Sequence, residues 1–218
     1  MRYNSAFFDL DGTLVDNSEG IFNGFKYALR ALGREREADE LPGFVIGPPL
    51  RSTFMDMFHM NEDQTEEAVR LYREFYRPVG LFQCSVYPYV EEMLQRLRRS
   101  GMGVYLATSK ARVFAEAILN HTGLMRWFDA VVGSELDGRL DNKAEIVRHL
   151  LDNVAPAEHL PAVMVGDRSH DAVGAAACGV DTAAALWGFG SEEEFLPCGN
   201  VRGLFRNARE LTDWLMEG

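Results

Sequence analysis

Lysine is scarce in this 218-residue chain, and long apolar runs are lacking. Three lysines stand among 22 basic residues, and the formal net charge is −11. Nucleic acids and anionic membrane surfaces select basic proteins, so we expect neither as a partner. No apolar run approaches the roughly 20 residues needed to span a bilayer, and no basic-then-apolar signal segment is recognisable. We therefore expect a cytoplasmic protein without membrane attachment.

Cysteine is also sparse. Cys84, Cys178 and Cys198 form no closely spaced pair and leave an odd number. This spacing indicates neither a disulfide framework nor a zinc site, and it favours free thiols in a reducing compartment. With 47% hydrophobic and 25% charged residues, the composition is that of an ordinary globular protein. The length fits one domain with an insertion or two small domains.

The segment AFFDLDGT (residues 6–13) combines an apolar run with two carboxylates, Asp9 and Asp11. The apolar part has the length and aromatic content of a buried strand. In an extended chain the two aspartates point to the same side, where they repel each other unless a cation lies between them. A divalent metal would meet that need. The alternative from the residues alone is an ordinary Asp-Gly turn after a strand.

Helical periodicity dominates the segment after this motif, and the pattern changes near residue 87. Apolar residues at helical spacing predict helices over 18–32, from Pro49 to about 58, and over 63–76, without a convincing strand between them. Beyond residue 87, short apolar runs at 104–107, 128–132, 162–165 and 182–186 alternate with helical patterns at 90–99, 112–121, 142–153, 172–178 and 208–216. This alternation predicts an α/β fold, a Rossmann-like parallel sheet covered by helices. We expect residues 1–15 and 84–218 to form this catalytic core and residues 16–83 to form an inserted helical cap.

Polar residues follow three of the predicted strands. Besides the first pair of aspartates, Thr108 and Ser109 follow one strand, and Asp167 follows another, with Asp171 four residues later. Carboxyl ends of parallel strands share one edge, so we expect these groups to converge. Four carboxylates in a partly dry cleft require a hard cation, and oxygen ligands point to Mg²⁺. Taken alone, the Thr108-Ser109 pair is more typical of a helix cap. Taken alone, the segment with Asp167 and Asp171 could be a turn that opens a helix.

Lys143 begins a predicted helix. Most lysines are solvated surface residues. A lysine nevertheless complements the positive amino end of a helix poorly, so a nearby anion would explain its position.

Four segments together resemble a known family. FFDLDGTLVD, LATSK, DNKAEIV and VGDRSHD match, in order and spacing, the four motifs of the haloacid dehalogenase superfamily. The resemblance is to its Mg²⁺-dependent phosphatases with a helical cap after the first strand. It implies Asp9 as nucleophile and Asp11 as general acid and base. It further implies a Mg²⁺ ion held by the Asp9 carboxylate, the Asp11 backbone carbonyl and Asp167, with Asp171 in or just behind that shell, and phosphate contacts from Thr108, the Ser109 amide and Lys143.

The segments GPPLR, SELDG and WGFGSEEE resemble a branch of phosphoglycolate phosphatases and bacterial 5′-nucleotidases, and they favour the nucleotidase side. The expected substrate is a small phosphate monoester, and the expected assembly a monomer or homodimer. Arg51 and Lys110 are candidate substrate contacts, although Arg51 fits a surface salt bridge equally well. We expect His170 to be a variable polar residue at the start of a helix and not a catalytic group. A phosphoglycolate phosphatase, a sugar phosphomutase and a non-catalytic ligand-binding module remain as alternatives. A metal-free haloacid dehalogenase is disfavoured by the presence of Asp11.

Overall fold

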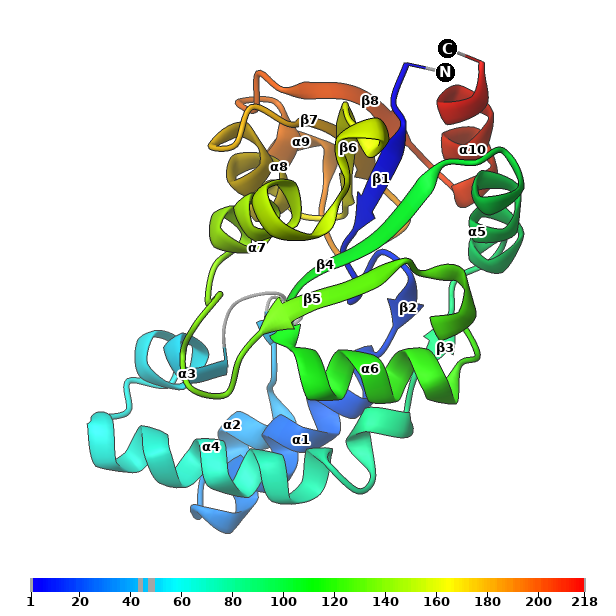
Figure 1. The fold of residues 1–218 in the computed structure, drawn as a ribbon. Helices are drawn as coiled ribbons and strands as arrows, with labels where there is room; N and C mark the ends of the chain where they lie inside the picture. Colours follow the sequence, from blue (N-terminus) through cyan, green and yellow to red (C-terminus); the bar gives the residue numbers. More distant parts are fainter. Residues whose placement is uncertain (1, 43–44, 47–49, 218) are drawn as a thin grey trace. The chain divides into compact units, whose positions relative to one another are not determined.

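A computed structural model describes residues 2–42, 45–46 and 50–217 (Figure 1). The chain divides into two compact units. One unit comprises Met1–Asp16 and Val86–Gly218, and the other comprises Asn17–Ser85. Among the described residues, no helix combines the length and apolarity that crossing a membrane would require.

A six-stranded parallel sheet forms the centre of the first unit, in the order β5-β4-β1-β6-β7-β8. The strands are β1 (Ser5–Phe8), β4 (Gly103–Ala111), β5 (Ala130–Ser134), β6 (Ala162–Gly166), β7 (Asp181–Ala185) and β8 (Val201–Phe205). Helices cover both faces, so the predicted α/β, Rossmann-like fold is confirmed.

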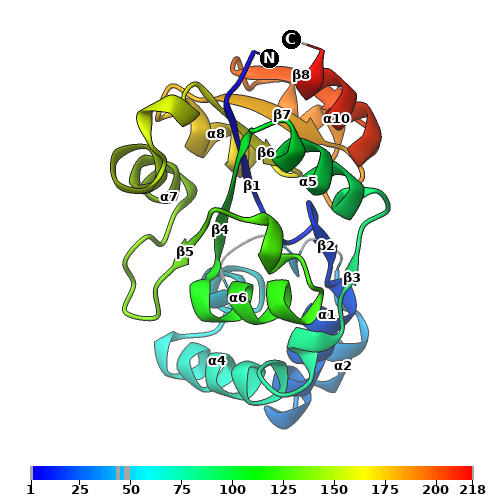
Figure 2. The same ribbon diagram turned by 45° about the vertical axis from the view of Figure 1, so that its right-hand side comes forward.

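Helices α7 and α8 lie on one face of the sheet, and α5 and α10 lie on the other (Figures 1 and 2). The core helices are α5 (Val90–Arg99), α6 (Arg112–His121), α7 (Lys143–His149), α8 (Ser169–Ala176), α9 (Glu192–Phe195) and α10 (Ala208–Met216). Alternate strand residues such as Phe7, Tyr105 and Met164 pack with Ile146 and Val147 in a buried cluster. Because both faces are covered, the strands are apolar on both sides, which is why they appear as short continuous apolar runs.

Several boundaries differ from the sequence prediction. The helix expected over 142–153 ends at His149 and continues as the π-helical turn η5 (Leu150–Val154). Helix α8 begins at Ser169, three residues early, because Asp171 in its first turn accepts a hydrogen bond from the Arg168 amide at 3.2 Å. Strand β8 and the short helix α2 were not predicted. The β8 sequence VRGLF has no continuous apolar run, as suits a strand at the sheet edge.

The second unit is largely helical. It contains α1 (Ser18–Ala31), α2 (Glu35–Asp39), α3 (Leu50–Ser52), the π-helical turn η2 (Thr53–Met57), α4 (Glu62–Tyr76) and the 3₁₀ turn η3 (Gly80–Phe82). Pro49, expected to begin the second helix, lies outside the described residues. The buried ring of Phe25 packs against Phe54 at 5.0 Å and Tyr72 at 5.2 Å between ring centroids. Strands β2 (Val15–Asp16) and β3 (Ser85–Val86) form a separate two-stranded sheet. They lie at the two points where the chain passes from one unit to the other.

Strand β1 lies at the point where the chain connections diverge. From β1 the chain continues to its neighbour β4, whereas from β6, on the other side of β1, it continues to β7. Loops that leave in opposite directions open a crevice at the carboxyl ends of the strands. Phe8 pairs with both Leu106 and Val165, so the residues that follow these three partners begin that crevice at the same level.

Candidate active site

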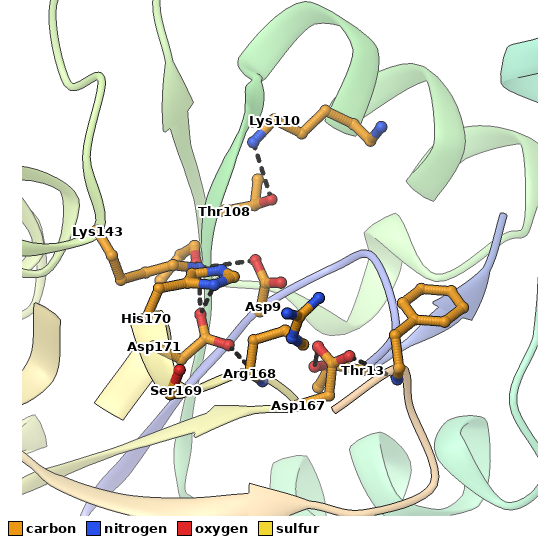
Figure 3. Close-up of polar contacts among 12 residues, drawn as sticks. Asp9, Thr13, Thr108, Lys110, Lys143, Asp167, Arg168, Ser169, His170 and Asp171 are labelled. Atoms are coloured by element: carbon orange, nitrogen blue, oxygen red, sulfur yellow. Dashed lines mark hydrogen bonds and ion pairs between the residues drawn. The ribbon is translucent and has the colours of Figure 1, made fainter. Parts of the chain in front are cut away.

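Three buried carboxylates converge at the carboxyl ends of β1 and β6. Asp9 directly follows β1, Asp167 follows β6, and Asp171 lies in the first turn of α8. Each offers a carboxylate oxygen, and these oxygens all lie within 4.8 Å of one another. Asp9 is 6% exposed, and the other two are fully buried. These three aspartates are called the acidic triad below, and Figure 3 shows how they face one another.

Lys143, the first residue of α7, lies between two members of the acidic triad. Its Nζ donates to Asp9 Oδ1 at 2.7 Å and to the Ala107 carbonyl at 2.6 Å, and it pairs with Asp171 Oδ1 at 2.8 Å. The ammonium therefore donates two hydrogen bonds, and its contact with Asp171 is an ion pair. The position of this lysine at a helix amino end is explained by the anions it faces, as the sequence suggested.

Helix α8 packs closely against the stem of this lysine. A Cβ atom built on Gly174 would lie 2.6 Å from Lys143 Cβ. Cys178, after the end of α8, donates from Sγ to the Ala144 carbonyl at 3.3 Å. The close approach of α7 and α8 therefore fixes the path by which the ammonium reaches the carboxylates.

Burial and mutual repulsion change the acidity of the acidic triad. Burial raises the pKa of Asp9; Lys143 opposes this shift, while the charges of Asp171 and Asp11 add to it. The pKa of Asp167 lies well above its usual range because of burial and the two neighbouring aspartates. Burial also acts against ionisation of Asp171, but Lys143 outweighs it and lowers that pKa.

The pKa of Lys143 is raised. Burial disfavours its charged form, but the charges of Asp171 and Asp9 outweigh that effect. The lysine is therefore charged at neutral pH, and its single positive charge lies against the carboxylates of Asp9 and Asp171.

The acidic triad fits a hard divalent cation. All three candidate ligands are carboxylate oxygens, the donor type that Mg²⁺ prefers. One ammonium cannot neutralise three buried carboxylates. Burial first, and then the charges of neighbouring carboxylates, raise the pKa values of Asp9 and Asp167. A divalent cation held by these oxygens would offset the remaining negative charge.

Asp167 is held from two directions by groups that the sequence reading did not single out. Thr13 Oγ1 donates to Asp167 Oδ1 at 3.1 Å, and the Phe189 amide donates to Oδ2 at 2.8 Å. Gly12 has a φ of +81°, and a Cβ there would overlap the Asp167 carboxylate. Both residues lie in segments with recognisable sequence patterns. Thr13 belongs to the first motif, and Phe189 belongs to the WGFGSEEE segment, which resembles phosphoglycolate phosphatases and 5′-nucleotidases.

Asp11 is not a member of the acidic triad, and its carboxylate forms an ion pair with Lys110. Its Oδ2 pairs with Lys110 Nζ at 2.8 Å. The sequence argument placed one cation between Asp9 and Asp11. In this structure Asp9 pairs with Lys143 and Asp11 with Lys110, and a divalent cation between the two carboxylates stays a prediction. The backbone carbonyl of Asp11 as a metal ligand stays a prediction.

Thr108 lies at the end of β4, next to β1, and its side chain is buried. Its Oγ1 accepts a hydrogen bond from the Lys110 amide at 3.2 Å, within a stretch where the β4–β5 register shifts. Helix α6 begins only at Arg112. The alternative that Thr108 and the half-buried Ser109 cap this helix was therefore wrong.

The remaining candidates have ion-pair partners of their own. In the second unit, Arg51 pairs with Glu62 at 3.4 Å and closely with Glu66 on α4, the surface salt bridge considered from the sequence. His170 Nε2 lies 3.8 Å from Asp171 Oδ1, and its side chain is 41% exposed. His170 thus lies beside the acidic triad, at the start of α8, without being one of its members.

Comparison with known proteins identifies the family. The family of haloacid dehalogenase-like hydrolases matches residues 6–185. A 5′-nucleotidase of Pseudomonas aeruginosa is 44% identical over 196 residues, covering 89% of this chain and 87% of that protein. The tyrosine-protein kinase PtkA of Mycobacterium tuberculosis is 39% identical over 84% of this chain, which spans only 62% of that relative. The crystal structure of a predicted phosphatase from Clostridium acetobutylicum superimposes with a TM-score of 0.90 at 34% identity, covering 100% of both chains.

The chain therefore belongs to the haloacid dehalogenase-like hydrolase family. Within that family it is a phosphatase that acts on small phosphate substrates.

We predict that Lys143→Met destabilises the first unit by about 3–5 kcal/mol in the presence of a chelator. The substitution leaves Asp9 and Asp171 buried without their cationic partner, and breaking a buried ion pair in this way costs about that much. Urea denaturation measures the loss. Arg148→Met, an exposed residue of the same helix, is the matched control and should cost less than about 1 kcal/mol. Equal unfolding midpoints for the two variants would contradict the prediction.

Proposed function

We propose that the protein is a Mg²⁺-dependent phosphomonoester hydrolase that forms an aspartyl-phosphate on Asp9, with a preference for nucleoside 5′-monophosphates. The observation that carries the proposal is the acidic triad around Lys143, at the carboxyl end of the central strand. It supplies a carboxylate nucleophile, a cation site and a charged anchor within one buried cluster.

Asp9 is the group best placed to attack phosphorus. Lys143 holds its Oδ1 at 2.7 Å, and its backbone amide donates to the Val165 carbonyl at 2.9 Å, so both the residue and its carboxylate have a fixed orientation. Attack forms the bond between an Asp9 oxygen and phosphorus while the bond to the ester oxygen breaks. Because Lys143 Nζ donates to Asp9 and to the Ala107 carbonyl, its role in this proposal is to orient Asp9 and to balance its charge. The phosphate contact expected of Lys143 stays a prediction.

Asp11 supplies the proton that the leaving alkoxide needs. In the second step it takes a proton from the water that attacks the phosphorus of the aspartyl-phosphate, which returns Asp9 and releases inorganic phosphate. The ion pair with Lys110 orients the Asp11 carboxylate that would carry out this proton transfer. Lys110, proposed from the sequence as a substrate contact, therefore also positions Asp11.

The substrate phosphate would be held by Thr108 and the Ser109 amide, next to β1. Asp9, Asp167 and Asp171 would hold Mg²⁺, assisted by the Asp11 backbone carbonyl; when bound, the ion neutralises charge on the phosphate oxygens. Residues 16–83, the proposed cap, would select the part of the substrate beyond the phosphate and exclude water.

The preference for nucleotides rests on the 44% identical relative named a 5′-nucleotidase. Phosphoglycolate phosphatase and sugar phosphomutase activities are the alternatives, since both act on the same phosphate chemistry. The kinase name of the Mycobacterium relative adds another acceptor, a protein hydroxyl, for the phosphoryl group. Phosphate release into buffer without an added acceptor distinguishes hydrolysis from both kinds of transfer.

We predict that Asp9→Asn lowers Mg²⁺-dependent phosphate release from an aryl phosphate by at least about a thousandfold, the scale on which loss of a catalytic nucleophile acts. Asp152→Asn, an exposed carboxylate on η5, is the matched control and should keep wild-type turnover. A chelator should abolish wild-type release, and added Mg²⁺ should restore it. Wild-type turnover by folded Asp9→Asn protein would exclude Asp9 as nucleophile.

We predict that Asp11→Asn accumulates the phosphorylated enzyme when an aryl phosphate is the substrate. A phenolate with a low pKa leaves without a proton from Asp11, whereas the attacking water still needs a base, so the second step slows more than the first. Intact-protein mass spectrometry after rapid mixing should show one added phosphoryl group. The Asp9→Asn/Asp11→Asn double variant should show none, and a modified double variant would place the phosphoryl group elsewhere.

We predict that kcat/KM for nucleoside 5′-monophosphates exceeds that for phosphoglycolate by at least about tenfold, which corresponds to about 1.4 kcal/mol of differential transition-state binding. A phosphate-release assay over nucleotides, phosphoglycolate and hexose phosphates measures the order. A preference for phosphoglycolate would support the first alternative. Conversion of a hexose 1-phosphate to its 6-phosphate without phosphate release would support the mutase.

A further inference from the structure

The loop after β7, residues 187–190, contacts the backbone and side chains of the active site without containing a residue of the acidic triad. Its sequence is Trp-Gly-Phe-Gly. Trp187 Nε1 donates to the Thr13 carbonyl at 2.9 Å, and the Phe189 amide donates to Asp167 Oδ2 at 2.8 Å. One short loop thus contacts the turn after β1 and the aspartate after β6 at the same time. It is named the WGFG loop below.

Two glycines allow the WGFG loop to lie directly on Asp167. A Cβ on Gly188 would lie 2.5 Å from Asp167 Cβ, closer than real Cβ atoms approach. A Cβ on Gly190 would overlap the Asp167 carbonyl oxygen and lie 3.2 Å from Arg168 Cδ. Residues 188–190 of the loop therefore lie close against Asp167, and no larger residue fits at position 188 or 190 without a shift.

Two hydrogen bonds connect Trp187 to Asp167, with Thr13 between them. The indole fixes the Thr13 backbone, and the hydroxyl of that threonine donates to Asp167 Oδ1 at 3.1 Å. With the Phe189 amide on Oδ2, both carboxylate oxygens accept a hydrogen bond from a group that the WGFG loop holds or contains. Each oxygen keeps a second lone pair for a metal ion.

We propose that Trp187 is a positioning residue for metal binding, which it promotes by holding Thr13 and so the orientation of the Asp167 carboxylate. This inference rests on the proposed function, because it assumes that Asp167 is a ligand of Mg²⁺. Groups that orient a metal ligand from behind typically change metal affinity or activity by 10–100-fold when they are removed. Trp187 touches neither substrate nor metal in this proposal, and acts through the hydrogen bond of its indole.

The test uses Trp187→Phe, which removes the indole N–H but keeps an aromatic ring. Trp127→Phe is the matched control, because the buried Nε1 of Trp127 has no hydrogen-bond partner among the described residues. Mg²⁺ affinity is measured by titration calorimetry on chelator-treated protein, well below the unfolding temperature of each variant. We expect about tenfold weaker Mg²⁺ binding for Trp187→Phe and wild-type binding for Trp127→Phe.

Two further measurements separate positioning from a merely structural role. The Mg²⁺ concentration for half-maximal phosphate release should rise about tenfold in Trp187→Phe, with kcat at saturating Mg²⁺ nearly unchanged. Thr13→Val should weaken Mg²⁺ binding similarly, whereas Thr13→Ser keeps the hydroxyl and should restore it. In this proposal Trp187 acts only by holding Thr13. The Trp187→Phe/Thr13→Val double variant should therefore bind Mg²⁺ no more weakly than whichever single variant has the lower Mg²⁺ affinity.

The outcomes distinguish this inference from the proposed function. If wild-type protein shows Mg²⁺-dependent phosphate release and Trp187→Phe binds Mg²⁺ as wild type does, the positioning role is overturned and the hydrolase assignment stands. A lowered unfolding temperature with unchanged Mg²⁺ affinity likewise overturns it. If wild-type protein binds no Mg²⁺, both are overturned together.

Discussion

The contact of Lys143 with Asp9 and Asp171 is the interaction on which the rest of the site depends. Buried charges are tolerated only when they are paired, and here one ammonium at 2.7 and 2.8 Å serves two carboxylates while a third lies nearby. One ammonium does not match the charge of three ionised carboxylates, and in the proposed function a hard cation would supply the missing positive charge.

Such a cluster can form only where distant parts of the chain meet with fixed register. Phe8 pairs with Leu106 and Val165, which sets Asp9 level with the carbonyl that receives Lys143 and with the strand end that leads to Asp167. The lysine itself arrives from α7 on one face, packed against Gly174 of α8. A rigid parallel sheet with short connections is suited to this task, because its strand ends hold side chains in place without long loops.

The parallel sheet and most of its helices could be predicted because buried strands and amphipathic helices leave strong periodic signals. Strand β8 could not, since an edge strand carrying Arg202 and Gly203 lacks an apolar run. The polar residues after three strands indicated where a site would form, but they did not indicate which side chains pair with one another. The ion pair of Asp11 with Lys110 joins residues 99 positions apart, and the hydrogen bond from the Phe189 amide to Asp167 joins residues 22 positions apart. Both depend on tertiary geometry that no local pattern encodes.

The charge of the cluster also constrains how a substrate can bind. Three carboxylates and one ammonium leave an excess of negative charge when ionised, and the chain as a whole carries −11. A phosphate monoester is itself a dianion near neutral pH, so it would meet repulsion at close range in a poorly screened site. Thr108 and backbone amides can orient its oxygens but bring no net charge. In the proposed function, a cation held by the acidic triad would be present before or together with the phosphate and would offset this repulsion.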